Sequence, residues 1–180
     1  MTVVTDEAAA YVATLLYNMQ GSIYIGIGKS SQWADDSKPD PEDSSKTNID
    51  EPLFYVKADT VQLCRPKLPT ESLTAETISY GSNQYVPVNA SASDAISSGA
   101  EYIYCSALLS PDNVGTVTFR EAGLFSGLQL NQGVTKTTVQ YSDIASLGSM
   151  LSLINQSPVS ITDTASARVS FLYHIKPATA

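Results

Sequence analysis

The chain has 180 residues, with 18 acidic and 10 basic side chains, a formal net charge of −8 and a pI near 4.4. This length suits one domain over residues 1–180 with a hydrophobic core of its own. The acidic balance disfavours nucleic-acid binding, which depends on lysine and arginine. No apolar run is long enough for a membrane span and the N-terminus lacks a basic start, so we expect a soluble chain with protein partners.

Residues 5–19 are predicted to form a helix. Thr5 can cap it, and Asp6 and Glu7 lie in the first turn, where the helix dipole favours negative charge. The helix has one apolar face, and its members are Val12, Leu15, Leu16 and Met19. We expect this face to pack in the core, and docking on a neighbouring subunit is the alternative.

Residues 22–28 are predicted to form an apolar strand. Its isoleucines share one face, while Gly26 and Gly28 leave the other face bare and open to close approach. The segment from Gly26 to Ser30 ends like a phosphate-binding loop, but Ile23 stands where that motif requires a further glycine. The spacing therefore argues against a nucleotide site.

A long acidic loop follows at residues 29–52. It has seven carboxylates between Asp35 and Glu51, is broken by prolines, and contains the only tryptophan, Trp33. We expect an exposed loop that Trp33 anchors and that is mobile until a neighbouring subunit orders it. Trp33, Asp35 and Asp36 are therefore interface candidates, and a calcium clamp or a carboxylate pair for hydrolysis are alternatives.

The middle of the chain is predicted to contain a β-hairpin. Residues 101–109 form the first strand, 111–113 the turn and 116–119 the second strand. The second strand runs into Arg120-Glu121-Ala122-Gly123-Leu124-Phe125. We expect Leu124 and Phe125 in the core and Gly123 at a position that excludes a side chain. Arg120 and Glu121 are interface candidates, paired locally or across a subunit boundary.

The remaining segments complete a mainly β pattern. Residues 134–140 and 167–175 read as strands, and 145–154 is ambiguous between helix and strand. The predicted fold class is an antiparallel β-sandwich-like domain with an N-terminal α-helix and long loops.

The sequence supplies little for catalysis, metals or cofactors. Cys64 and Cys105 each lie in an apolar run, so we expect buried free thiols, with a disulfide as the alternative. His174 is the only histidine, and the chain has neither a Cys-x-x-Cys pair nor a Gly-x-Ser-x-Gly elbow. We therefore predict no enzyme activity, no metal site and no cofactor.

Three groups of residues resemble one protein family, the peripheral baseplate wedge subunit of contractile-tailed bacteriophages. Residues 23–30 with Trp33 resemble that family's strand, Gly-[Lys/Arg]-Ser turn and tryptophan after an N-terminal helix. Residues 141–158 and the closing strand resemble its ending. Residues 120–125 are similar to an Arg-Glu-[Ala/Val/Ile]-Gly-Leu-Phe element of phage tail-fibre attachment and baseplate proteins. The departure is size, because the phage subunit is longer and carries an inserted middle domain.

The resemblance implies a non-enzymatic virion protein of the tail baseplate, assembled in the host cytoplasm. It would link neighbouring baseplate and tail-fibre proteins, as a homodimer or as part of a hetero-oligomeric wedge. The alternative from another class is a carbohydrate-binding or adhesin-like β module of a virion or cell surface, because the chain has ten tyrosines that could line a sugar-binding face.

Overall fold

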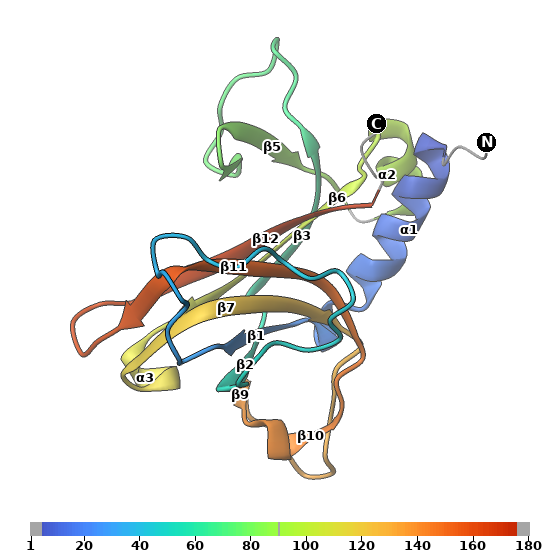
Figure 1. Ribbon diagram of the computed structural model, residues 1–180. Coiled ribbons are helices and arrows are strands. Elements are labelled where there is room, and N and C mark those ends of the chain that lie inside the picture. Colours follow the sequence, from blue (N-terminus) through green and yellow to red (C-terminus); the bar gives the residue numbers. More distant parts are fainter. Residues whose placement is uncertain (1–4, 90, 176–180) are drawn as a thin grey trace. The chain divides into compact units, whose positions relative to one another are not determined.

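The computed structural model describes residues 5–89 and 91–175 (Figure 1). It is mainly β and antiparallel, with an N-terminal helix, as predicted. The chain forms two compact units. The first holds the N-terminal segment up to Met19, Thr60–Cys105 and the chain from Phe171, and the second holds Gln20–Asp59 and Ser106–Ser170. The expectation of one domain over residues 1–180 stays a prediction.

The second unit is organised around a five-stranded antiparallel sheet in the order β11-β7-β1-β2-β9. Strands β8 and β10 pair in a separate two-stranded sheet. The elements that lie wholly in this unit are η1 (Gln20–Ser22), β1 (Tyr24–Gly28), β2 (Phe54–Lys57), α3 (Pro111–Val114), β7 (Val117–Ser126), β8 (Gln129–Leu130), β9 (Thr138–Val139), η2 (Tyr141–Asp143), β10 (Ile144–Ser146) and β11 (Ser149–Ile161).

Glycines at the centre of this sheet make room for aromatic rings. Gly26 of β1 lies opposite Gly123 of β7 and Tyr55 of β2. The rings of Tyr55 and Phe125 meet edge to face, 5.3 Å apart, and a Cβ on Gly26 would lie 2.8 Å from Phe125. Every residue of β1 is buried, which fits its place between two strands. Leu124 and Phe125 are in the core, as predicted.

The first unit contains two helices and most of a second sheet, whose strand order is β12-β6-β3-β5-β4. Strands β6 and β12 contribute residues to both units. The elements not yet named are α1 (Asp6–Asn18), β3 (Thr60–Pro66), β4 (Ile78–Tyr80), β5 (Asn83–Pro87), α2 (Ala92–Ser98), β6 (Tyr102–Leu109) and β12 (Ala167–His174). Thr5 caps α1 by accepting a hydrogen bond from the Ala8 amide, as predicted.

The face of α1 that was expected to pack in the core is exposed, so this prediction is wrong. Val12, Leu15 and Met19 are 41–46% exposed, and Leu16 is only half-buried. The helix buries its opposite face instead, which consists of Ala9, Ala10, Ala13 and Thr14. Alanines allow close approach to α2 and β3, which both contact α1. The helical period was right, but the side that packs inward was wrong.

Other expectations also changed in the structure. The hairpin of β6 and β7 does not form, because β6 joins the β12-β6-β3-β5-β4 sheet while β7 lies between β11 and β1. The ambiguous segment 145–154 is β-structure. The strand expected at 134–140 is reduced to β9, and the final strand is confirmed as β12.

Both cysteines are free and fully buried, as predicted. Burial raises the pKa of each thiol to about 12. None of the helices in the described part of the chain is both long and apolar enough to cross a membrane.

Candidate interface formed by the acidic loop

The acidic loop, residues 29–52, is closed at its base by hydrogen bonds. The Lys29 amide donates to the Asp50 carbonyl at 2.8 Å, and the Leu53 amide donates to the Ile27 carbonyl at 2.8 Å. The Glu51 carboxylate accepts hydrogen bonds from Ser30 Oγ, from Ser31 Oγ and from the Ser31 amide. These bonds, Ser31 foremost, hold the pKa of Glu51 at about 2. The two ends of the loop are thus joined.

Arg120 of β7 fixes the first part of the loop. Its guanidinium donates to both carboxylate oxygens of Asp36, at 2.7 and 2.8 Å, and to the Ser30 carbonyl at 2.8 Å. The Arg120 residue is 5% exposed. This side-on pairing lowers the pKa of Asp36. Asp36 therefore meets an arginine of its own chain.

Glu121, the next residue of β7, holds the end of the loop. It is fully buried, and its carboxylate accepts hydrogen bonds from the Asp50 amide and from Lys46 Nζ at 2.9 Å. The Lys46 amine also reaches Asp50 at 2.7 Å. A buried carboxylate without such partners would be strongly unfavourable, so Glu121 and Lys46 depend on each other.

Trp33 anchors the loop as predicted, and its anchorage lies within the same chain. Only 8% of the residue is exposed. Its Nε1 donates to the Gln156 carbonyl of β11 at 3.0 Å, and Lys29 Nζ lies 5.2 Å from the centre of its ring. Asn155 of β11 adds a further tie by donating to the Asp40 carbonyl and to the Glu42 carboxylate.

Two glycines let the loop approach the sheet. A Cβ on Gly28 would collide with the Asp50 carbonyl, and one on Gly123 would lie 2.9 Å from Ile49 Cγ2. Ile49 is itself only 3% exposed. The bare positions of β1 and β7 are therefore occupied in part by the loop, and the expectation that Gly123 excludes a side chain is confirmed.

The carboxylates in the middle of the loop face solvent, unlike Asp36 and Glu121. Asp35, Asp40, Glu42 and Asp43 are exposed, and none of them forms an ion pair within the described residues. The carboxylates of Asp35 and Asp43 accept hydrogen bonds from nearby Ser37 and Ser45, and these bonds lower the pKa of each carboxyl. This outer surface is therefore negatively charged and polar.

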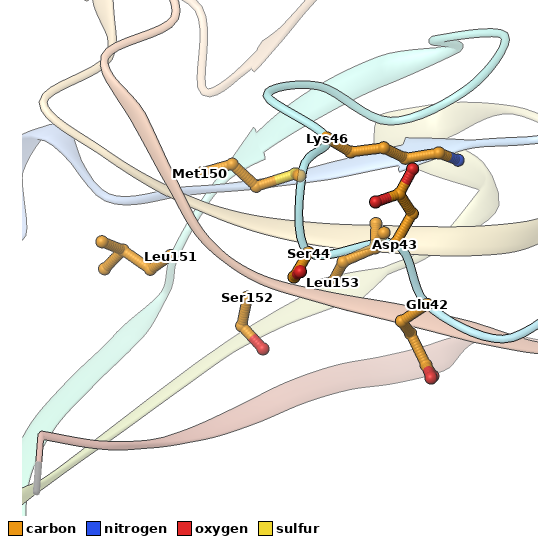
Figure 2. Close-up of a pocket in the computed structure, with 8 residues that line it drawn as sticks. All are labelled: Glu42, Asp43, Ser44, Lys46, Met150, Leu151, Ser152 and Leu153. Atoms are coloured by element: carbon orange, nitrogen blue, oxygen red, sulfur yellow. The ribbon is translucent and has the colours of Figure 1, made fainter. Parts of the chain in front are cut away.

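A shallow cavity of about 290 Å³ separates this part of the loop from β11. Figure 2 shows its lining: Glu42, Asp43, Ser44 and Lys46 come from the loop, and Met150, Leu151, Ser152 and Leu153 come from β11. The wall formed by β11 is largely apolar and the wall formed by the loop is charged. In the order of the sheet β11 is an edge strand, so the loop borders an edge of the sheet.

Of the five predicted interface residues, Trp33, Asp36 and Arg120 are linked, because the Asp36 carboxylate accepts from the Trp33 amide and from Arg120, while Glu121 holds the other end of the loop. Asp35 lies outside this group and faces solvent. Arg120 and Glu121, which we expected to be paired locally or across a subunit boundary, are both paired with distant residues of their own chain. Sequence reasoning missed Lys46, Glu51 and Asn155. A buried carboxylate at Glu121 needs a cation, but no local spacing pointed to Lys46, 75 residues away.

The carboxylates do not converge on a metal site. Among residues 5–89 and 91–175, no group of three or more histidine, cysteine, aspartate or glutamate side chains is placed to hold a metal ion. The ordering of the loop that the structure does show comes from Arg120, Lys46, Trp33 and Asn155.

Comparison with known proteins identifies a family and a relative. Residues 1–175 match the family described as "Baseplate wedge 3 tail fiber network component". The protein "Virion protein 3" of Enterococcus phage phiEF24C is 28% identical over 148 residues, which is 82% of this chain and 81% of that protein. The resemblance drawn from the sequence motifs is therefore confirmed at the level of the family.

Proposed function

Because the chain belongs to the baseplate wedge 3 tail fiber network component family, we propose that the outer surface of its acidic loop is a contact to a neighbouring virion protein. The chain is a structural virion component of the phage baseplate and tail fibre network, and its family is not a family of enzymes. Membership of this network implies contacts with other baseplate and tail fibre proteins. The proposal concerns which surface makes one of them.

The observation that supports the proposal is that some carboxylates of the loop are paired within the chain and others are not. The inner carboxylates of Asp36 and Glu51 are paired within the chain, while Asp40, Glu42 and Asp43 are exposed without an ion pair among the described residues. Arg120, Lys46 and Trp33 hold the two ends of the loop in place, which limits the conformational freedom that the segment between them loses on association. A neighbour with lysine or arginine on its surface fits the exposed carboxylates. The Arg120 and Lys46 anchors would then act through the loop rather than touch the neighbour.

Neutralising the exposed carboxylates tests the proposal. The triple variant Asp40→Asn, Glu42→Gln and Asp43→Asn should be incorporated into particles less well than wild type. The difference between variant and wild type should be largest at low salt, where charge pairing is strongest. The matched control is Glu76→Gln, Asp112→Asn and Asp163→Asn, which removes the same charge from other exposed sites. Equal incorporation of both variants would contradict the proposal.

We also propose that the chain acts within a hetero-oligomeric wedge rather than as a free homodimer. A net charge of −8 disfavours self-association and favours a partner of opposite charge. Sedimentation of the purified protein should therefore give a monomer at micromolar concentration. A stable dimer would favour the homodimer instead.

A further inference from the structure

The outer face of α1 and its C-cap residue, Met19, present large apolar side chains to solvent. Tyr11 is 54% exposed, Leu15 46%, Met19 42% and Val12 41%. The opposite face of the same helix is buried through small residues such as Ala9, Ala10 and Ala13. A helix in a soluble protein usually places its large apolar residues inward, so this arrangement is inverted. We call Tyr11, Val12, Leu15 and Met19 the outer stripe.

The spacing of the outer stripe is that of a helix–helix seam. Val12, Leu15 and Met19 of the outer stripe follow one another at intervals of three and four residues, and Ala8, four residues before Val12, extends the same series; all four are exposed. An apolar seam with this spacing keeps facing one partner helix that packs alongside at a small crossing angle. The seam covers about 16 Å of helix at 1.5 Å per residue. Its shape therefore fits another helix better than it fits a strand.

The charge beside the outer stripe limits the identity of that helix. Glu7 of α1 is exposed and lies one helical turn before Tyr11, at the border of the outer stripe. Neither α1 nor α2 contains a lysine or arginine. In a helix pair, residues that flank the apolar seam choose the partner by charge. The matching partner therefore carries lysine or arginine beside its own apolar stripe.

A second copy of this chain does not meet that requirement. Two copies joined through α1 would bring carboxylates together without a cation from either helix, and each copy has a net charge of −8. The four side chains of the stripe also form a small surface compared with the roughly 800 Å² that each partner of a stable interface usually buries. The seam suits one contact among several in a larger assembly.

We propose that the outer stripe of α1 docks an amphipathic α-helix of a different virion protein, with lysine or arginine flanking that helix's apolar stripe. This surface is separate from the acidic loop. The inference rests on membership of the tail fibre network and does not require that the acidic loop bind anything.

The first test replaces one apolar side chain of the stripe. Leu15→Glu should leave folding intact, since the side chain is exposed and glutamate is as good a helix former as leucine. We expect a melting temperature within about 3 °C of wild type and a loss of incorporation into particles of about tenfold or more. The control Leu73→Glu makes the same chemical change at a loop residue that is 63% exposed, and it should be incorporated normally. Normal incorporation of Leu15→Glu would overturn the proposal.

The second test identifies what covers the stripe. A photo-reactive benzoylphenylalanine at position 15 is cross-linked in assembled particles, and the attached peptide is sequenced. The proposal requires a cross-link to a helical segment of another virion protein with lysine or arginine beside its apolar stripe. A cross-link to a second copy, to an acidic or non-helical segment, or no cross-link at all would overturn it.

The two proposed surfaces can be separated by repeating the cross-linking with the acidic-loop triple variant. A cross-link from position 15 that persists when the loop variant has lost incorporation efficiency shows two independent contacts. If the loop variant is incorporated normally and position 15 still cross-links to a basic helix, the loop proposal fails and this one stands. If position 15 gives no cross-link in particles with the unchanged loop while the loop variant is incorporated poorly, this proposal fails and the loop proposal stands.

Discussion

At the scale of single residues, the loop and the sheet are fitted to each other through positions that cannot hold a side chain. Gly123 is the clearest example. Its missing Cβ leaves room for Ile49 from the loop, for the Phe125 ring and for Met150 of β11, at 2.9, 2.9 and 3.2 Å from where a Cβ would stand. Three separate segments therefore meet at one glycine, and a residue with a larger side chain must displace at least one of them.

We predict that Gly123→Val lowers the free energy of unfolding by about 1–3 kcal/mol, because the added methyl groups overpack a filled site. Urea unfolding measures it. Gly21→Val is the matched control, since a Cβ at Gly21 meets no atom within 4 Å and its backbone is not left-handed. Equal destabilisation by the two variants would mean that valine acts through the backbone at both sites rather than through the Ile49 contact.

The cysteines give a second prediction at this scale. Both thiols are fully buried, and their pKa values are raised to about 12, so neither forms a reactive thiolate near neutral pH. The native protein should react with a thiol reagent very slowly, and protein denatured without reductant should show two thiols. Denatured protein with no titratable thiol would contradict the free state of Cys64 and Cys105.

At the scale of elements, the sequence predicted local features well and long-range pairings poorly. Strand β1 follows from its alternating isoleucines, and the core positions Leu124 and Phe125 follow from their apolar side chains; both signals depend only on neighbours in the chain. The hairpin of β6 and β7 was wrong because strand partners depend on packing against distant segments. For α1 the periodicity identified a face, but the alanines that decide which side can approach α2 gave no hydrophobic signal.

The acidic loop was predicted as an element, while its anchors were only partly predictable. Trp33 stands out by composition, and Arg120 and Glu121 stand out as charges inside an apolar run. Their partners Asp36 and Lys46 lie 84 and 75 residues away in sequence. Only the folded chain brings these residues together, so the sequence left open whether the pairs were local or between subunits.

The pairing of the loop carboxylates predicts its behaviour in acid. The pKa of Glu51 is lowered from its ordinary value of 4.5 to about 2, chiefly by hydrogen bonds from Ser31, and Arg120 lowers that of Asp36. A lowered pKa in the folded state stabilises the loop above the unfolded value, and this stabilisation is lost as the pH falls toward the folded value. We therefore expect the loop to detach between about pH 4.5 and 2.

Trp33 reports this change directly, because it is the only tryptophan of the chain and is a buried residue of the loop itself. Its fluorescence emission should shift to longer wavelength over that pH range, before the far-UV circular dichroism signal of the strands is lost. In Glu51→Gln the shift should already be partly present at pH 7 and should depend less on pH. Unchanged emission down to pH 2 with the strands intact would show that these carboxylates do not hold the loop.

At the scale of the whole molecule, the charges near the sheet and the groups on the exposed surface are arranged differently. Charges near the sheet are paired within the chain, as in Arg120 with Asp36 and Lys46 with Glu121. The exposed surface keeps unpaired carboxylates on the loop and an apolar stripe on α1, and both are features of contact surfaces. A structural subunit whose contacts lie with other proteins fits this distribution.

The free chain and the assembled particle should differ in one part of the loop. The sequence alone led us to expect mobility throughout residues 29–52 in the isolated protein. That expectation stays a prediction, but the anchors favour a narrower version of it. The Lys29 amide donates to the Asp50 carbonyl across the base of the loop, and the Asp50 amide donates to the buried Glu121 carboxylate of β7. The amides of Lys38 and Ser45 bond instead within local turns.

Hydrogen exchange followed residue by residue in both states tests the narrower version. In the isolated protein, Lys29 and Asp50 should exchange slowly and residues 37–45 quickly, because exchange follows local opening. In the particle, residues 37–45 should become slow as the neighbour covers the exposed carboxylates, while Lys29 and Asp50 change little. Fast exchange of 37–45 in both states would leave this part of the loop in solvent and remove it from the interface. Fast exchange at Lys29 and Asp50 in the isolated protein would instead restore the expectation of a wholly mobile loop that only assembly orders.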